Sequence, residues 1–316
     1  MDKCVNGKSV ITLMGPTASG KSAAGLLLAE RFGCEIITVD SAQVFKGMDI
    51  GTAKPSIEEQ QRIRHHLLDI RDPAKSYSAA EFRKDALRLI DEILARGNVP
   101  LLVGGTNLYF RALLQGLSDL PAANTKVRAE IEAQAQYLGW PAMHQYLQKI
   151  DPVAAARIHA TDPQRIQRAL EVYKISGKTM TELCQLKQDE PVFPYRNVKI
   201  IMAPQDRSWL HQRIAVRFKQ MLEQGMVNEV QGLYARGDLQ PDLPAIRAVG
   251  YRQVWAYLEN EYDARQMHDK AVIATRQLAK RQLTWLRKEQ SATWFECSAA
   301  GILLEVEGFV KRQLHQ

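Results

Sequence analysis

The sequence lacks the features that mark membrane and secreted proteins. None of its apolar runs approaches the length of a membrane-spanning helix, and residues 1–8 contain no apolar signal-peptide segment. Cysteine is scarce: Cys4, Cys34, Cys184 and Cys297 lie far apart and form neither a CxxC pair nor a Cys/His cluster with zinc spacing. We therefore expect a cytoplasmic protein with unpaired thiols and no membrane partner.

The most informative stretch that is present covers residues 15–22, Gly-Pro-Thr-Ala-Ser-Gly-Lys-Ser. It lies between an apolar strand pattern at residues 10–14 and a helical pattern at residues 23–31. The G-x-x-x-x-G-K-S spacing in this context predicts a phosphate-binding loop, with a plain glycine turn as the alternative. Loop N–H groups and a helix N-terminus attract phosphate oxygens. Lys21 adds a positive charge, and the Ser22 hydroxyl is placed to bind Mg²⁺.

A second apolar run at residues 35–40 ends in Asp40, and together with the loop and its helix it predicts a βαβ unit. Ligands of such sheets bind at the carboxyl ends of the strands. Asp40 is therefore expected to face the same crevice as the loop, or else to cap a turn.

A further absence concerns an acid at the end of the strand at residues 99–103. Phosphate-loop ATPases carry an acidic residue there that helps to hold Mg²⁺, whereas this strand runs into Gly104, Gly105 and Thr106. The absence argues against hydrolysis of a nucleoside triphosphate. The two glycines would let a ligand approach the backbone. The Thr106 hydroxyl would bond within the crevice or cap the next helix.

The order of these patterns predicts an α/β fold: a P-loop NTPase-like parallel sheet flanked by helices. Residues 120–193 read as helices without a strand, with caps at Asn124 and Asp162. We expect them to form an inserted, all-helical small domain. Residues 1–119 and 194–316 would form the core, whose C-terminal part is helical and basic.

The basic residues are concentrated toward the C-terminus. The net charge is +7, and residues 247–288 hold nine Lys/Arg against four Asp/Glu. Beside a phosphate loop this favours a nucleic-acid substrate, although a solvated helix face is the alternative. Arg213 and Arg217 are four residues apart on an expected helix, so both could reach a charged leaving group, or both could be surface residues.

Several blocks in order resemble the bacterial tRNA dimethylallyltransferases, also called tRNA delta(2)-isopentenylpyrophosphate transferases. The resemblance extends over about residues 10–290. The blocks are residues 15–22 (GPTASGKS), 40–43 (DSAQ), 47–55 (GMDIGTAKP), 66–69 (HLLD), 104–106 and 108–109 (GGT and LY), 247–252 (RAVGYR) and 280–287 (KRQLTWLR).

The resemblance implies transfer of a dimethylallyl group from dimethylallyl diphosphate to the N6 amine of the adenosine 3′ of the anticodon, in tRNAs reading codons that begin with U. Mg²⁺ would be the cofactor, and the protein would act as a monomer. Asp40 would be the general base. Lys21, Arg217 and Mg²⁺ on Ser22 would offset the charge of the leaving diphosphate, and Thr106 would bond near the base or the bridging oxygen.

By the same resemblance the loop binds the diphosphate of the donor and not ATP, through Gly15, Pro16, Thr17, Ala18, Ser19, Gly20, Lys21 and Ser22. A larger set would contact the tRNA anticodon stem-loop: Asp40, Ser41, Ala42, Gln43, Thr106, Arg128, Gln164, Arg165, Ile166, Gln167, Arg168, Arg247, Ala248, Val249, Gly250, Tyr251, Arg252, Lys280, Arg281, Gln282, Leu283, Thr284, Trp285, Leu286 and Arg287. The chain departs from the pattern at Asn107, where relatives often have glycine or methionine, and at Ser22, where threonine is commoner.

Three other functions remain as alternatives. A phosphate-loop kinase of a nucleoside or small alcohol would need a second acid for Mg²⁺. A free-nucleotide isopentenyltransferase would not need the basic blocks around Arg247 and Lys280. A non-catalytic RNA-binding protein would leave Asp40 without a role.

Overall fold

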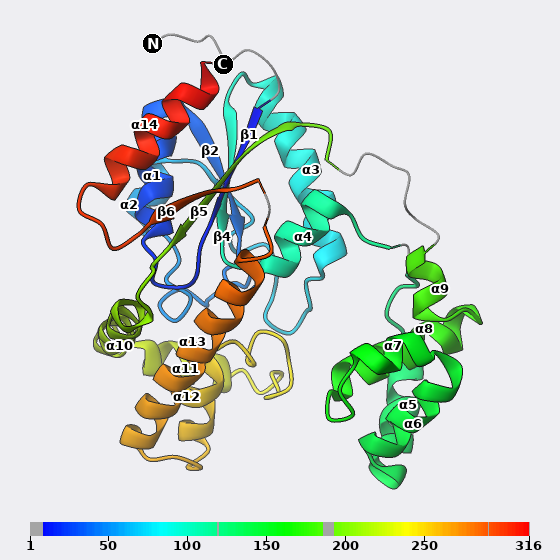
Figure 1. Cartoon of the computed structure of the whole chain (residues 1–316). Helices are drawn as coiled ribbons and strands as arrows, with labels where there is room; N and C mark the ends of the chain where they lie inside the picture. The colour runs from blue at the N-terminus through cyan, green and yellow to red at the C-terminus, as the bar shows by residue number, and fades with distance from the viewer. Residues whose placement is uncertain (1–8, 119, 186–192, 290, 316) are drawn as a thin grey trace. The chain divides into compact units, whose positions relative to one another are not determined.

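The computed structural model describes residues 9–118, 120–185, 193–289 and 291–315. The chain divides into two compact units, Met1–Gln115 with Phe193–Gln316, and Gly116–Val192 (Figure 1). The boundaries expected from the sequence lie within a few residues of these. Cys4 lies outside the described residues, and Cys34, Cys184 and Cys297 form no disulfide.

The first unit is built on one parallel sheet. Its strand order is β3-β2-β4-β1-β5-β6, so β1 is central and lies between β4 and β5. This arrangement confirms the predicted α/β fold. The strands are β1 (Ser9–Met14), β2 (Cys34–Val39), β3 (His65–His66), β4 (Val99–Gly104), β5 (Arg196–Ala203) and β6 (Thr293–Glu296).

Helices cover both faces of this sheet, which explains why its central strands are apolar at nearly every position. Alternate side chains of β1 enter two separate cores: Val10 and Met14 in one, Ile11 and Leu13 in the other. The second core includes residues of α1 (Lys21–Phe32) and α14 (Ile302–Leu314). The first includes residues of α3 (Ala79–Ala95) and α4 (Asn107–Gln115).

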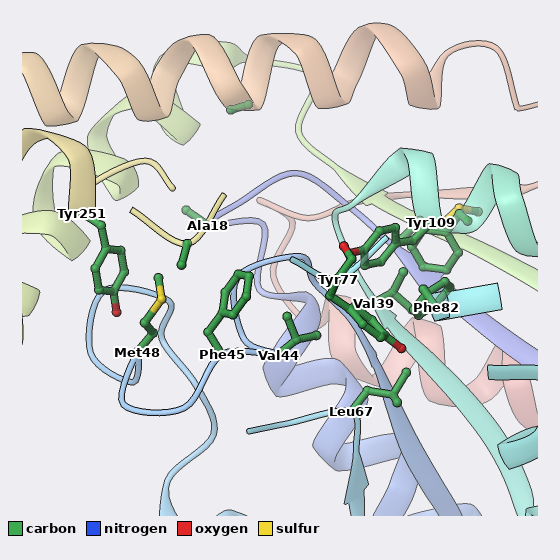
Figure 2. Packing of buried hydrophobic residues seen from close by; sticks show 14 of the residues in the cluster. Ala18, Val39, Val44, Phe45, Met48, Leu67, Tyr77, Phe82, Tyr109 and Tyr251 are labelled. Carbon is green, nitrogen blue, oxygen red and sulfur yellow. The ribbon is translucent and has the colours of Figure 1, made fainter. Parts of the chain in front are cut away.

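Four further helices extend the first core beyond the sheet: α10 (Arg207–Glu223), α11 (Met226–Tyr234), α12 (Tyr251–Leu258) and α13 (Ala264–Leu286). Asp206 and Asp263 cap α10 and α13 through their side chains. Figure 2 shows part of this core, where Tyr251 lies beside Met48. Among the described helices, including the short α2 (Ile57–Arg62), none has the length and apolar character needed to cross a bilayer.

The second unit contains helices and no strand among its described residues. Asn124 caps α5 and Asp162 caps α8, as predicted. The unit has a core of its own, which includes Ile131, Leu147 and Ile166. Its helices are α5 (Thr125–Leu138), α6 (Trp140–Ile150), α7 (Pro152–Arg157), α8 (Pro163–Ser176) and α9 (Met180–Gln185).

Candidate active site at the carboxyl ends of the strands

The loop between β1 and α1 depends on its glycines. A Cβ on Gly15 would lie 2.5 Å from the carbonyl oxygen of Met202, too close for any other residue. Gly20 adopts φ 89°, a left-handed conformation that glycine accepts without strain. The Lys21 Nζ donates to the carbonyl oxygen of Pro16 at 3.2 Å, so the lysine side chain folds back along the loop.

The loop keeps unsatisfied hydrogen-bonding groups. The N–H of Ser19 donates to the Pro16 oxygen, and the N–H of Thr17 donates to Gln282. Within the described part of the chain, the N–H groups of residues 18, 20, 21 and 22 donate to no acceptor, and the buried Ser19 hydroxyl also has no partner. These donors lie at the N-terminus of α1. An anion such as phosphate would satisfy them.

Three of the four predicted catalytic residues form one charged cluster around this loop. Burial, and after it the positive charge of Arg217, lower the pKa of Lys21 to about 8, although the negative charge of Asp40 partly opposes them. Burial also lowers the pKa of Arg217, again opposed by Asp40. Helix α10 thus supplies Arg217 and the end of β2 supplies Asp40. Two partly buried cations with one nearby carboxylate give this end of the sheet an excess of positive charge, suited to an anionic ligand.

Arg213 has a different partner from Arg217. Its Nε donates to the carbonyl oxygen of Ala18 at 2.9 Å, and its guanidinium lies 4.8 Å from the ring centroid of Trp209. Arg213 therefore binds α10 to the backbone of the loop, while Arg217 contributes positive charge beside Lys21.

The fourth predicted catalytic residue, Thr106, connects two strand ends. Its hydroxyl accepts the N–H of Ser41 at 3.0 Å, and its own N–H donates to Val39 at 3.2 Å. The Asp40 Oδ1 accepts the N–H of Ala42 at 2.8 Å. Asp40 therefore has the turn role that the sequence left open, in addition to any chemical role. The Thr106 hydroxyl bonds across to the end of β2 and not to the N–H groups of α4.

Gly104 and Gly105 correct one expectation. We expected them to admit a ligand to the backbone, but the protein itself occupies that space. A Cβ on Gly104 would lie 2.0 Å from the carbonyl oxygen of Val39, and one on Gly105 would lie 2.5 Å from Nε2 of Gln282. The glycines are therefore needed so that β2 and α13 can approach the end of β4.

The family resemblance predicts that Gln282 contacts tRNA, and the structure gives its side chain two protein partners. Its Oε1 accepts the Thr17 N–H at 2.9 Å, and its Nε2 donates to Gly105 O at 2.9 Å. Asn107, one of the departures from the family pattern, donates through Nδ2 to the Gln282 carbonyl at 3.3 Å. In the sequence, only the pair Gly104-Gly105 indicated that another part of the chain or a ligand comes close to the end of β4. The pair did not indicate that Gln282 is the partner.

Five residues of the predicted tRNA-contacting set have no exposed side chain in the structure. Their side chains, or for the glycine its backbone, are packed inside the protein; for example, Tyr251 is 1% exposed and Ile166 0%. They are Ile166, Gly250, Tyr251, Leu283 and Leu286. The exposed members of the same blocks remain candidates: Gln164, Arg165, Arg247, Arg252, Lys280, Arg281, Thr284, Trp285 and Arg287.

Sequence reasoning missed Glu229, which fixes the segment at residues 49–51. Its carboxylate accepts three backbone N–H groups, from Asp49, Ile50 and Gly51, at 2.9, 2.7 and 3.2 Å. The Tyr251 hydroxyl donates to the same carboxylate at 2.5 Å. The buried tyrosine is therefore a structural anchor for this segment.

In the helical unit, two predicted tRNA contacts meet on one buried carboxylate. Arg128 Nε and Arg168 Nη1 donate to Glu171 at 2.9 and 2.7 Å, and the Glu171 side chain is fully buried. The Asn124 N–H also donates to it, at 2.8 Å. Glu171 thus holds both guanidinium groups in place at the start of α5, which the sequence alone did not indicate.

Comparison with known families decides the relationship. The IPP transferase family model matches residues 43–289. The chain belongs to this family. The matched region begins after the phosphate-binding loop and includes β4, both basic blocks and the whole of the helical unit.

Solved structures agree with this family over nearly the full chain. A tRNA isopentenylpyrophosphate transferase from Bacillus halodurans is 38% identical, with a TM-score of 0.71 and 97% of each chain covered. The tRNA delta(2)-isopentenylpyrophosphate transferase of Staphylococcus epidermidis is 31% identical, with a TM-score of 0.68 and coverage of 98% and 99%. A eukaryotic dimethylallyltransferase acting on tRNA is 28% identical, with a TM-score of 0.74, and 88% of this chain matches 69% of that one.

Proposed function

We propose that this member of the IPP transferase family transfers a dimethylallyl group from dimethylallyl diphosphate to the N6 amine of the adenosine 3′ of the anticodon, in tRNAs reading codons that begin with U. The products are N6-(dimethylallyl)adenosine in tRNA and diphosphate. The resemblance in sequence, the family match and a neighbour described as acting on tRNA support the reaction class.

The observation that carries the proposal is the charged cluster of Lys21, Arg217 and Asp40 at the loop. A diphosphate leaving group needs positive charge at the site where its negative charge develops, which Lys21 and Arg217 supply. The adenine amine must lose a proton as the new C–N bond forms, and Asp40 is the carboxylate available for it. The Asp40 Oδ1 is held by turn N–H groups, which orients the carboxylate.

Mg²⁺ fits the donor set. Ser22, at the start of α1, has an exposed hydroxyl, and in the described residues no cluster of three or more acids, histidines or cysteines forms a protein-only metal site. Mg²⁺ is commonly held by few protein ligands together with substrate phosphates and water. We propose that Ser22 contributes one ligand. The bound ion would supply additional charge neutralisation to the diphosphate.

One assay tests the function against its alternatives. Purified protein is incubated with unmodified tRNA, labelled dimethylallyl diphosphate and Mg²⁺, with AMP and ATP supplied in parallel reactions. Label in tRNA but not in AMP is the expected result. Label in AMP would indicate a free-nucleotide isopentenyltransferase, and ATP consumption without prenyl transfer would indicate a kinase.

Asp40→Asn tests the base. The amide oxygen can still accept the Ala42 N–H, so the turn persists, but the group no longer takes a proton. Turnover at saturating tRNA should fall by about 100-fold or more while the Kd for tRNA stays near that of the wild type. If tRNA binding is lost instead, with turnover per bound complex unchanged, Asp40 is a recognition residue.

A further inference from the structure

The side-chain amide of Gln282 joins two segments at the carboxyl ends of the strands, the loop between β1 and α1 and the end of β4. On one side lies Thr17, in the loop expected to hold the donor diphosphate. On the other side lies Gly105, which precedes Thr106. The two hydrogen bonds are both 2.9 Å, and they use both ends of the amide.

We propose that Gln282 is a positioning residue that fixes the donor loop relative to the Thr106 and Asp40 side of the crevice, and that its side chain does not act through contact with tRNA. This inference rests on the proposed function and deepens it. Thr106 accepts from Ser41, the neighbour of Asp40, so one planar amide fixes the loop against the end of β4 and, through it, the end of β2. A misplacement of about 1 Å between reacting groups can cost about 100-fold in rate.

The surroundings of Gln282 support this assignment. Glycine at position 105 leaves room for the amide, since a Cβ there would lie 2.5 Å from Nε2. The Asn107 side chain holds the Gln282 carbonyl, so the end of α13 is tied down by backbone as well as side chain. Its neighbours Arg281 and Thr284 are exposed, whereas Gln282 is only partly so. Different faces of α13 thus serve the loop and the solvent.

The uncharged variant Gln282→Met keeps the length of the side chain and removes both hydrogen bonds. We expect turnover at saturating tRNA and donor to fall about 10- to 100-fold, while the Kd for tRNA changes less than about threefold. Gln277→Met is the matched control, because it makes the same change at an exposed position of the same helix and should behave as wild type. Gln282→Glu keeps an acceptor for Thr17 but faces the Gly105 oxygen with a carboxylate, so it should be at least as slow.

The outcomes separate the two roles of Gln282. If excess tRNA restores wild-type turnover to Gln282→Met, the side chain is a tRNA contact and the inference is wrong. The inference is equally wrong if the loss of rate only follows the fraction of unfolded protein, which thermal melting of each variant measures. If Gln282→Met does not fold, Gln282→Glu, which is closest in shape to the wild type, takes its place in the comparison.

Binding of inorganic diphosphate distinguishes this inference from the proposed function, because it requires no prenyl transfer. Releasing the Thr17 N–H alters the loop, so Gln282→Met should bind inorganic diphosphate several-fold more weakly than Gln277→Met. If the wild type fails to prenylate tRNA but this difference appears, the proposed function fails and the link between Gln282 and the loop stands. If neither diphosphate affinity nor turnover changes, the inference fails alone.

Discussion

The Thr106 hydroxyl accepts the backbone N–H of Ser41 at 3.0 Å, and this bond joins the ends of β4 and β2 directly beside Asp40. The Thr106 N–H donates to Val39 in the same region. The position of the expected base therefore depends on a hydroxyl that comes from another strand.

Thr106→Val tests this relationship, because it keeps the shape of the side chain and removes the acceptor. The bond is worth about 1 kcal/mol if it only positions Ser41, so turnover should fall about fivefold at saturating substrates. Thr106→Ser retains the hydroxyl and should stay within about threefold of wild type. Single-turnover rates measure both. A loss in Thr106→Ser with none in Thr106→Val would mean that the threonine methyl group, and not the hydroxyl, is what the site requires.

Gly104→Ala should destabilise the protein, since the added Cβ would lie 2.0 Å from the carbonyl oxygen of Val39. Backbone in two paired strands of the sheet would have to move, so we expect a loss of about 3 kcal/mol or more in the free energy of unfolding. Gly232→Ala in α11 is the control. Nothing lies within 4 Å of its added Cβ, and alanine favours a helix by about 1 kcal/mol. The free energy of unfolding, measured with denaturant, should therefore fall for Gly104→Ala and rise for Gly232→Ala.

Elements with a strong local pattern could be predicted from the sequence. The central strands are apolar on both faces. Helices such as α3 begin at a capping box, which Ser78 and Glu81 predict from their spacing. The edge strands β3 and β6 could not be predicted. They have two and four residues, too few for periodicity, and Thr293 and Trp294 of β6 are exposed.

The loop and Asp40 were found because each lies at the end of a recognisable strand. The hydrogen bond between Gln282 and Thr17 could not be predicted, because Thr17 is 265 positions away and no local pattern links the two residues. The same limit applies to Glu171, whose charge is balanced by Arg128 from another helix. Which buried polar groups meet is decided by tertiary packing.

Glu171→Gln should remove a pH-dependent part of the stability. Burial alone would raise the pKa of Glu171, but hydrogen bonds from Arg128 and Arg168 outweigh it and lower the pKa below its ordinary value. A carboxyl group with a lowered pKa stabilises the fold above its unfolded pKa, and that contribution is lost as the pH falls through the folded value. The variant should therefore be less stable at neutral pH by about 1–3 kcal/mol, and the difference should shrink in acid.

Unfolding by denaturant at neutral and acidic pH measures this difference. Glu130→Gln provides the control, because Glu130 lies in the same helical unit, is 62% exposed and pairs with Lys174 at 3.5 Å. Exposed pairs of this kind contribute about 0–1 kcal/mol, so this variant should differ little from wild type at either pH. A Glu171→Gln deficit that stays constant with pH would show that the charge of Glu171 is not the stabilising feature.

Lys21 gives the site a distinct pH dependence. Its pKa is lowered to about 8 by burial and by Arg217, compared with 10.5 for an exposed lysine. Between these values the folded protein binds fewer protons than the unfolded chain, so this group makes the free energy of unfolding rise with pH over that interval. Diphosphate placed beside Lys21 favours its charged form and should raise its pKa. Binding above about pH 8 should therefore take up a proton.

Calorimetric titration with inorganic diphosphate at about pH 8.5, in two buffers with different ionisation enthalpies, measures that proton. With a pKa near 8, Lys21 is roughly three-quarters neutral there, so wild type should take up about 0.7 proton more than Lys21→Met. Lys219→Met is the control: Lys219 is 75% exposed on α10, and its loss should leave the uptake unchanged. Equal uptake in wild type and Lys21→Met would mean that Lys21 is already protonated in the free protein. The attraction of Asp40 would then outweigh the combined effect of burial and of the repulsion from Arg217 on the pKa of the lysine.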